Sequence, residues 1–255
     1  FYGSWGQSFH SNDVRGALST VDSYATLQNR LNGTPGIVTQ SPVPLLTKAT
    51  GYEFGVRSQQ GPFELNAAFF VLDIASELTF SGDAGDTSAG RASRRIGFEV
   101  GAKYRPKPWL LLDIDWSHTQ ARFLGFDNGA SDTVPGHSGN AIPGSVGDVV
   151  SAGVSFDGAN GWSGGVRLRY FGPRTLIEDS SVRSPATALV DAHIVHALTE
   201  RIVLRLDVFN LLNARAHQID YYYASRLPNE ASAVSNIHFH PAEPLSLRLG
   251  ATVYF

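Results

Sequence analysis

Two histidines and a glutamate near the end of the sequence have the residue types of a metal site. In "HFHPAE", His238, His240 and Glu243 lie within six residues. A metal site in a protein needs at least three such ligands that converge and are supported by further hydrogen bonds. The alternative is a histidine pair at a surface or rim, hydrogen-bonded to loop backbone, with Pro241 and Pro244 stiffening the chain beside it. We favour the histidine pair and predict neither a metal nor a cofactor.

Two other segments resemble pieces of hydrolytic sites. "HSGN" at 137–140 suggests a serine hydrolase, and Asp83 with Asp86 suggests an aspartate-based protease. Catalysis needs a nucleophile, a base and a group that orients the base. Neither segment has a partner at a position that a strand would fix, so both are more typical of loops. We therefore expect that the protein is not an enzyme.

A run of three tyrosines offers binding rather than bond chemistry. Adjacent aromatic side chains on a loop provide stacking surface and hydroxyl hydrogen bonds for a ligand. Packing of this loop onto the rest of the protein is the alternative. The candidate ligand-binding residues, all on predicted loops, are Asp13, Arg15, Tyr221, Tyr222, Tyr223, His238 and His240.

The segment after these histidines alternates apolar and polar side chains up to the last residue. From Leu245 to Phe255, Leu247, Leu249 and Val253 share one face, and the intervening residues are polar or small. Successive side chains of a strand point to opposite faces, so this period of two predicts a strand with one apolar side.

The same alternation recurs along the chain, bounded by residues typical of turns. It predicts an all-β protein of about ten strands and no helix. The predicted strands are 1–10, 52–60, 62–80, 95–105, 109–116, 146–157, 162–171, 187–198, 201–209 and 245–255.

The predicted connections alternate between short and long. Tight turns such as "PKP" at 106–108 and "DGANG" at 157–161 are each followed by a long connection. The long connections are roughly 11–49, 81–90, 124–145, 172–186 and 212–243. Nothing in a β-sandwich requires short and long connections to alternate. An antiparallel up-and-down transmembrane β-barrel, in contrast, has short periplasmic turns at one end and long extracellular loops at the other.

The two faces of the predicted strands differ in charge. One face is nearly uncharged and carries aromatic residues at strand ends, as at a membrane interface. The other face carries charges of both signs, which suits a wet lumen. These charges would crowd the interior of a closed ten-strand barrel. We therefore predict an open segment of a wider barrel, with no ladder between 1–10 and 245–255. The lumen charges include Glu53, Arg57, Glu64, Glu99, Lys103, Asp113, Asp115, Arg167, Arg169, Asp191, Arg205, Asp207 and Arg248.

Composition excludes several classes of protein. A net charge of -3 gives no basic surface for nucleic acid. The sequence contains no cysteine, which excludes disulfides and thiolate metal sites. It also contains no methionine, so we expect a processed chain or a segment of a longer one. No apolar run is long enough for a spanning helix, and no leader peptide is recognisable.

Several segments together resemble the C-terminal part of a TonB-dependent outer membrane receptor. "DVFNLLN" is similar to a turn that precedes the last long loop in that family, and the terminal Phe255 is similar to the residue that such proteins present to the barrel-assembly machinery. The segments that carry the resemblance are "GQSFHSNDVRG" at 6–16, "YEFGVRS" at 52–58, "DVFNLLN" at 207–213, "DYYYASRLP" at 220–228 and "IHFHPAEPLSLRLGATVYF" at 237–255.

The resemblance implies a barrel of about 22 strands, of which residues 1–255 are the C-terminal portion without the plug domain or the TonB box. It implies uptake of a small-molecule ligand, such as a metal chelate or a glycan, across the Gram-negative outer membrane. The expected partners are outer membrane lipid, that ligand, and TonB through a plug outside this sequence. Two alternatives stay open: a self-contained small outer membrane barrel acting in adhesion or hydrolysis, and a soluble β-sandwich that binds a partner.

Overall fold

The computed structural model describes the chain except for residues 12–17, 19, 23–25, 27–28, 35, 40–43, 82–85, 90, 126–138 and 159. Ten long strands form one antiparallel sheet. They are β1 (Tyr2–Ser11), β4 (Leu46–Gln60), β5 (Phe63–Ile74), β8 (Ser93–Lys107), β9 (Leu110–Phe123), β10 (Asp148–Asp157), β11 (Trp162–Phe171), β12 (Thr187–Thr199), β13 (Ile202–Phe209) and β16 (Ser246–Val253). The predicted all-β fold and its ten strands are confirmed.

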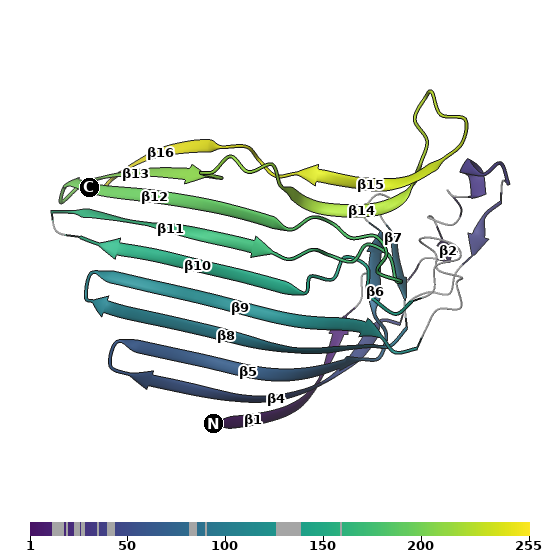
Figure 1. Cartoon of the computed structure of the whole chain (residues 1–255), viewed down its shortest axis with the longest axis horizontal. Helices are drawn as coiled ribbons and strands as arrows, with labels where there is room; N and C mark the ends of the chain where they lie inside the picture. Colours follow the sequence, from purple (N-terminus) through teal and green to yellow (C-terminus); the bar gives the residue numbers. More distant parts are fainter. Residues whose placement is uncertain are drawn as a thin grey trace.

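The long strands pair in chain order, and each except β1 and β16 pairs with the long strands before and after it. The short turns all lie at one end of the sheet, and the long connections all lie at the other (Figure 1). We call these the turn end and the loop end. This arrangement is the one that alternating connection lengths predict for an up-and-down barrel.

Cross-strand register keeps the two faces separate over the whole sheet. Leu206 lies opposite Leu249 on β16 and opposite Ile194 on β12, and the charged Asp207 lies opposite Arg248 and His193. Because residues that face each other across a ladder share a face, the apolar side chains form one continuous surface. The polar face is the predicted lumen face.

Aromatic residues lie near both limits of the apolar face. Trp109 and Trp162 lie beside turns, and the ring of Trp162 stacks on His196 at 4.0 Å between centroids. Tyr52 and Trp116 lie toward the loop end, where Trp116 meets Phe98 edge to face at 4.8 Å. Such girdles are typical of strands that cross a bilayer.

The sheet is open. Both β1 and β16 lie within the described residues, and each pairs with one neighbour only, β4 and β13 respectively. The two ends of the chain accordingly lie at opposite edges of the sheet (Figure 1). This confirms the expectation of an open segment over a closed ten-strand barrel.

Short strands extend the loop end beyond the sheet. They form three hairpins, which the sequence did not predict: β2 (Val21–Asp22) with β3 (Val38–Thr39), β6 (Leu78–Ser81) with β7 (Asp86–Ala89), and β14 (His217–Ser225) with β15 (Val234–Pro241). Helical conformation in the described residues is confined to scattered positions after β1. No described helix has the length and hydropathy that a membrane-spanning helix requires.

The small apolar core lies at the loop end. Phe123, Ile142, Leu176 and Ile177 are the buried hydrophobic residues of the described chain, and Ile177 is 1% exposed. Phe123 lies on the lumen face of β9. The described part of the connection after β9, at 139–147, and the connection after β11 therefore lie on the lumen side of the sheet. This core gives the loop end a fixed shape.

Candidate functional site at the loop end of the sheet

The exit from β13 is set by two asparagines in "DVFNLLN". Asn210 and Asn213 both have φ of 49°, a left-handed conformation that asparagine tolerates better than most residues. The buried Asn210 side chain accepts a hydrogen bond from Ala214 N at 2.8 Å and donates to Glu243 O at 2.9 Å. Asn213 accepts from Leu245 N at 3.1 Å. These bonds hold the outgoing and returning chains of the β14–β15 hairpin together at its base.

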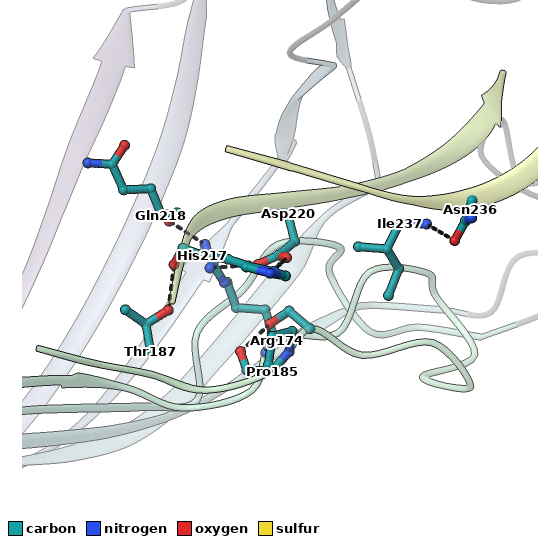
Figure 2. A network of polar contacts seen from close by, with 9 residues as sticks. Arg174, Pro185, Thr187, His217, Gln218, Asp220, Asn236 and Ile237 are labelled. Atoms are coloured by element: carbon teal, nitrogen blue, oxygen red, sulfur yellow. Dashed lines mark hydrogen bonds and ion pairs between the residues drawn. The ribbon is translucent and has the colours of Figure 1, made fainter. Parts of the chain in front are cut away.

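A buried polar network attaches the same hairpin to the connection between β11 and β12 (Figure 2). Arg174 Nη2 donates to Asp220 Oδ2 at 3.0 Å, and Arg174 Nη1 donates to Gln218 O at 3.3 Å. The other carboxylate oxygen of Asp220 lies 2.5 Å from His217 Nδ1. Thr187 Oγ1, at the start of β12, donates to His217 O at 2.5 Å. The four side chains therefore link β14 to two segments of the wall.

Burial makes this network energetically important. The Asp220 side chain is fully buried, and the Arg174 side chain is 10% exposed. A buried charge is tolerated only where it is paired and hydrogen-bonded. Removal of either partner would leave the other uncompensated, so we expect this pair to contribute to the position of the hairpin.

The hairpin presents a face of aromatic and imidazole side chains. His238 lies opposite Tyr221, and the ring of Tyr223 stacks on that of His238 at 3.9 Å between centroids. A groove of about 360 Å³ runs along this face, lined by Tyr221, Tyr223, Ile237, His238, Phe239 and His240. A larger hollow, about 460 Å³, lies among Trp5, Phe54 and their neighbours on the apolar face of the sheet and belongs to the wall.

The structure brings together four of the seven residues predicted to bind ligand. Tyr221, Tyr223, His238 and His240 line the groove. Tyr222 belongs to the same hairpin but pairs with Ile237 and is absent from the groove lining. Asp13 and Arg15, and also His137, Ser138 and Asp83 of the hydrolase motifs, lie outside the described residues.

The predicted histidine pair lies on β15, where His238 and His240 share a face because they are two residues apart on one strand. The backbone carbonyl of Glu243 accepts from Asn210. In the part of the chain that the structure describes, no three metal-ligating side chains gather closely enough to hold an ion.

The lumen face below the hairpin carries paired charges. Arg167 Nη2 lies 2.9 Å from Asp113 Oδ2, and Arg167 Nη1 donates to Ser151 at 2.8 Å. Arg169 pairs with Asp191 at 2.7 Å. A further pair, Arg205 with Asp207, is 2.6 Å long. These pairs neutralise part of the charge that the sequence places on the lumen face.

A second partly buried network joins Glu77, just after β5, to the first residues of β8. Glu77 accepts hydrogen bonds from Ser93 Oγ at 2.5 Å and from both terminal nitrogens of Arg95 at 2.8 Å. Burial raises the pKa of the Glu77 carboxyl, but the bonds from Arg95 and Ser93 outweigh it and hold that pKa below its ordinary value. Nearby, Arg91 pairs with Glu178 and lies over the Phe123 ring at 4.3 Å.

Sequence reasoning missed the residues that anchor the hairpin. The three consecutive tyrosines interrupt the alternation that would have revealed β14. Arg174 and Asp220 are 46 residues apart, and nothing local marks them as partners. Asn210 and Asn213 did carry a signal, because two asparagines just beyond a strand are typical of left-handed turn positions.

Comparison with known proteins identifies the family. Residues 1–211 match the family model described as "TonB dependent receptor-like, beta-barrel". A curated relative, the pesticin receptor of Yersinia enterocolitica, is 26% identical over 210 residues, which cover 79% of this chain and 29% of that protein.

Solved structures share the fold. The ferric yersiniabactin uptake receptor FyuA from Yersinia pestis is 19% identical with a TM-score of 0.62, covering 99% of this chain and 34% of that one. The copper transporter OprC is 15% identical with a TM-score of 0.68, covering 99% of this chain and 36% of that one. The chain thus spans about a third of the length of the relatives it matches.

Proposed function

The chain belongs to the TonB-dependent receptor-like β-barrel family, and on that premise we propose that it forms the wall and ligand-capturing loops of an uptake receptor. Its place is the Gram-negative outer membrane, where receptors of this family lie. The family consists of receptors rather than enzymes. In our proposal the chain binds and admits a ligand without making or breaking its bonds.

One observation carries the proposal: a groove of aromatic and imidazole side chains is held in a fixed position at the loop end. The anchor through Arg174 and Asp220 prevents the hairpin from swinging freely. Stacked rings such as Tyr223 and His238 offer flat apolar surface with polar edges. That surface suits a small molecule with planar groups.

We propose a metal chelate as the ligand class, with a glycan as the alternative. Planar aromatic or heteroaromatic groups, which many chelators carry, would stack on the exposed edges of the groove. Tyr221 and His240 would supply hydrogen bonds. Relatives named for ferric yersiniabactin and for ferric catecholates support the chelate. Energy for uptake would come from TonB through a plug domain outside this chain.

The ten strands would be part of a wider barrel. The free sides of β1 and β16 carry backbone groups that cannot remain unpaired in lipid. Further strands of the same receptor are the partners we propose. The small self-contained barrel would require a ladder between these two strands. The soluble sandwich would require a second stacked sheet, and the long strands form one.

The proposal is tested by binding of radioactive iron chelates to cells that produce the complete receptor. A panel of ferric catecholate, ferric phenolate and ferric hydroxamate chelates serves as the probe. We expect the double variant Tyr221→Ala with His238→Ala to lower affinity for the accepted chelate about tenfold or more, because it removes two ring contacts. Uptake of that chelate should also cease in cells without TonB.

Tyr104→Ala is the matched control, since Tyr104 lies on the apolar face near the turn end. It should leave chelate binding unchanged at equal receptor abundance. Unchanged affinity in the groove variant for every bound chelate would show that capture occurs elsewhere. Binding of oligosaccharides but no chelate would favour the glycan.

A further inference from the structure

The carboxylate of Asp191, on the lumen face of β12, makes two different contacts. Its Oδ1 accepts a hydrogen bond from the backbone N–H of Asn210 at 2.9 Å. Its Oδ2 accepts a hydrogen bond from Arg169 Nη2, on β11, at 2.7 Å. One side chain therefore joins a charged residue of the lumen wall to the turn at the base of the β14–β15 hairpin.

The N–H of Asn210 needs a side-chain acceptor because the strand ends here. β13 ends at Phe209, and Asn210 takes a left-handed φ of 49°. The next residue, Leu211, donates its N–H to Val190 O at 2.7 Å. Asn210 is only 3% exposed, and a buried N–H without a partner costs free energy. The Asp191 side chain supplies the acceptor.

A glycine on β10 determines which arginine holds Asp191. Arg167 lies directly opposite Asp191, two residues before Arg169 on the same face. Arg167 nevertheless pairs with Asp113 on β9, at 2.9 Å, across Gly153, which lies opposite both of them. A Cβ at position 153 would lie 2.7 Å from Arg167 Nη2 and 2.8 Å from Asp113 Oδ1, and would displace this pair. Because Gly153 leaves the path open, Asp191 pairs with Arg169 instead.

The two contacts of Asp191 lie in different surroundings. The turn at Asn210 is buried, whereas the Arg169 side chain is 48% exposed on the lumen face. A hydrogen bond weakens steeply when its donor and acceptor lose their alignment. The bond from Arg169 restricts rotation of the carboxylate and so keeps Oδ1 in line with the N–H of Asn210.

We propose that Arg169 and Asp191 are positioning residues for the ligand-capturing hairpin. Arg169 holds the Asp191 carboxylate in the orientation that receives the N–H of Asn210, and this bond fixes the direction in which the chain leaves β13. The consequence for ligand binding rests on the function proposed above, whereas the consequence for the hairpin base does not. A residue inside the lumen thereby sets the position of a groove at the loop end.

Hydrogen exchange of the complete receptor in lipid nanodiscs, measured by mass spectrometry with fragmentation that resolves single amides, tests the first step. Arg169→Gln should raise the exchange rate of the Asn210 amide about threefold, since a half-exposed ion pair contributes modestly. The midpoint of urea unfolding should stay the same. Arg169→Lys, which keeps the charge, should restore most of the native rate.

A double-mutant cycle tests whether Arg169 acts through Asp191. Asp191→Ala should raise the Asn210 exchange rate roughly tenfold or more, because it removes the acceptor of a buried N–H. In the Asp191→Ala background, Arg169→Gln should add no further increase. Heat-modifiable migration on gels confirms that each variant is folded before exchange is measured.

Arg167→Gln is the matched control, because it removes the same charge from the same face of β11 and Arg167 pairs with Asp113. It should leave the Asn210 rate unchanged. Three results would overturn the proposal: a native rate in folded Arg169→Gln, additive effects in the double variant, or an equal effect of Arg167→Gln.

Binding of the radioactive chelate panel to cells separates this proposal from the proposed function. Arg169→Gln should weaken binding of the accepted chelate up to about threefold, in step with the opening of the hairpin base. If the Asn210 rates change as expected while chelate affinity stays native in Arg169→Gln and in the double variant of Tyr221 and His238, the positioning role is supported and capture by the groove is refuted.

Discussion

Asp220→Ala should release the β14–β15 hairpin from the wall. The substitution removes the carboxylate that pairs with Arg174 at 3.0 Å and lies 2.5 Å from His217. Arg174 then keeps one bond from its terminal nitrogens to the hairpin, to Gln218 O at 3.3 Å. Its Nε has no hydrogen-bond partner among the described residues even before the change. A guanidinium that is 10% exposed is left without a counter-charge.

The size of the effect follows from burial. Breaking a buried ion pair by removing one partner costs about 3 to 5 kcal/mol. The hairpin extends beyond the sheet (Figure 1) and joins it mainly through its base and this network. The least costly response is local detachment rather than unfolding of the wall. Opening of the hairpin should therefore become roughly two to three and a half powers of ten more frequent.

Hydrogen exchange measured by mass spectrometry on the membrane-embedded receptor detects this opening. Backbone amides of β14 and β15 should exchange faster by that factor, while those of β8 and β9 should keep their native rates. Asp220→Asn, which keeps the volume and one acceptor oxygen, should give a smaller increase.

Asp73→Ala is the control for loss of an ion pair as such. Its pair with Arg94 is more exposed, with side chains 32% and 47% accessible, and exposed pairs contribute only about 0.2 to 1 kcal/mol. Native exchange rates in the hairpin of Asp220→Ala would refute the idea that the buried pair anchors it. An equal acceleration by Asp73→Ala would refute it as well.

Three further predictions concern the wall and the loop end. Leu204→Arg should lower the free energy of unfolding by about 2 to 4 kcal/mol if Leu204 lies near the bilayer midplane, whereas Ser163→Arg on the lumen face should have a mild effect, as measured by urea titration in lipid vesicles. Asn210→Ala should cost about 2 to 3 kcal/mol because it removes three hydrogen bonds and places alanine at φ of 49°; a protease-resistant hairpin base in this variant would contradict it. Because the folded pKa of Glu77 is lowered, its stabilising effect is complete above the ordinary value of 4.5 and is lost only as pH falls through the folded pKa. Protection factors around Arg95, from which the intrinsic pH dependence of amide exchange has been removed, should then be constant above pH 4.5 and should fall as the pH decreases through the folded pKa of Glu77; Glu77→Gln should abolish this fall.

The sheet could be predicted from sequence because its physical cause is local. A strand that separates lipid from a wet lumen must alternate, so pairs such as Arg205 and Leu206 reveal both the element and its two faces. The alternation of short and long connections then predicts the antiparallel up-and-down order of the strands. The ends of the strands were predicted less accurately than their centres. For example, β4 begins at Leu46 rather than near Tyr52. Beyond the bilayer the outward face of a strand no longer needs to be apolar. The alternation of apolar and polar residues is therefore weaker there, and the end of the strand is harder to predict.

The loop end could be predicted only in part, because its causes are not local. Tyr221 and His238 were identified from residue type, yet their pairing on one hairpin depends on a register that the sequence does not show. The Arg174 anchor joins residues from different connections.

The energetic difference between wall and loop end bears on how such a receptor can change its ligand. In lumen pairs such as Arg169 with Asp191 one partner is exposed: the arginine side chain is 48% accessible. Replacing one residue of such a pair should therefore lower the free energy of unfolding only slightly. The Arg174–Asp220 pair is buried, and we expect replacement of either residue alone to detach the hairpin. Tyr221 and His238 are under neither constraint, because their partly buried rings lie on the open face of the hairpin. In the receptor that we propose, substitution there would alter what the groove contacts while the anchor still fixes where the groove lies, so ligand preference would change without loss of the barrel or of the hairpin's position.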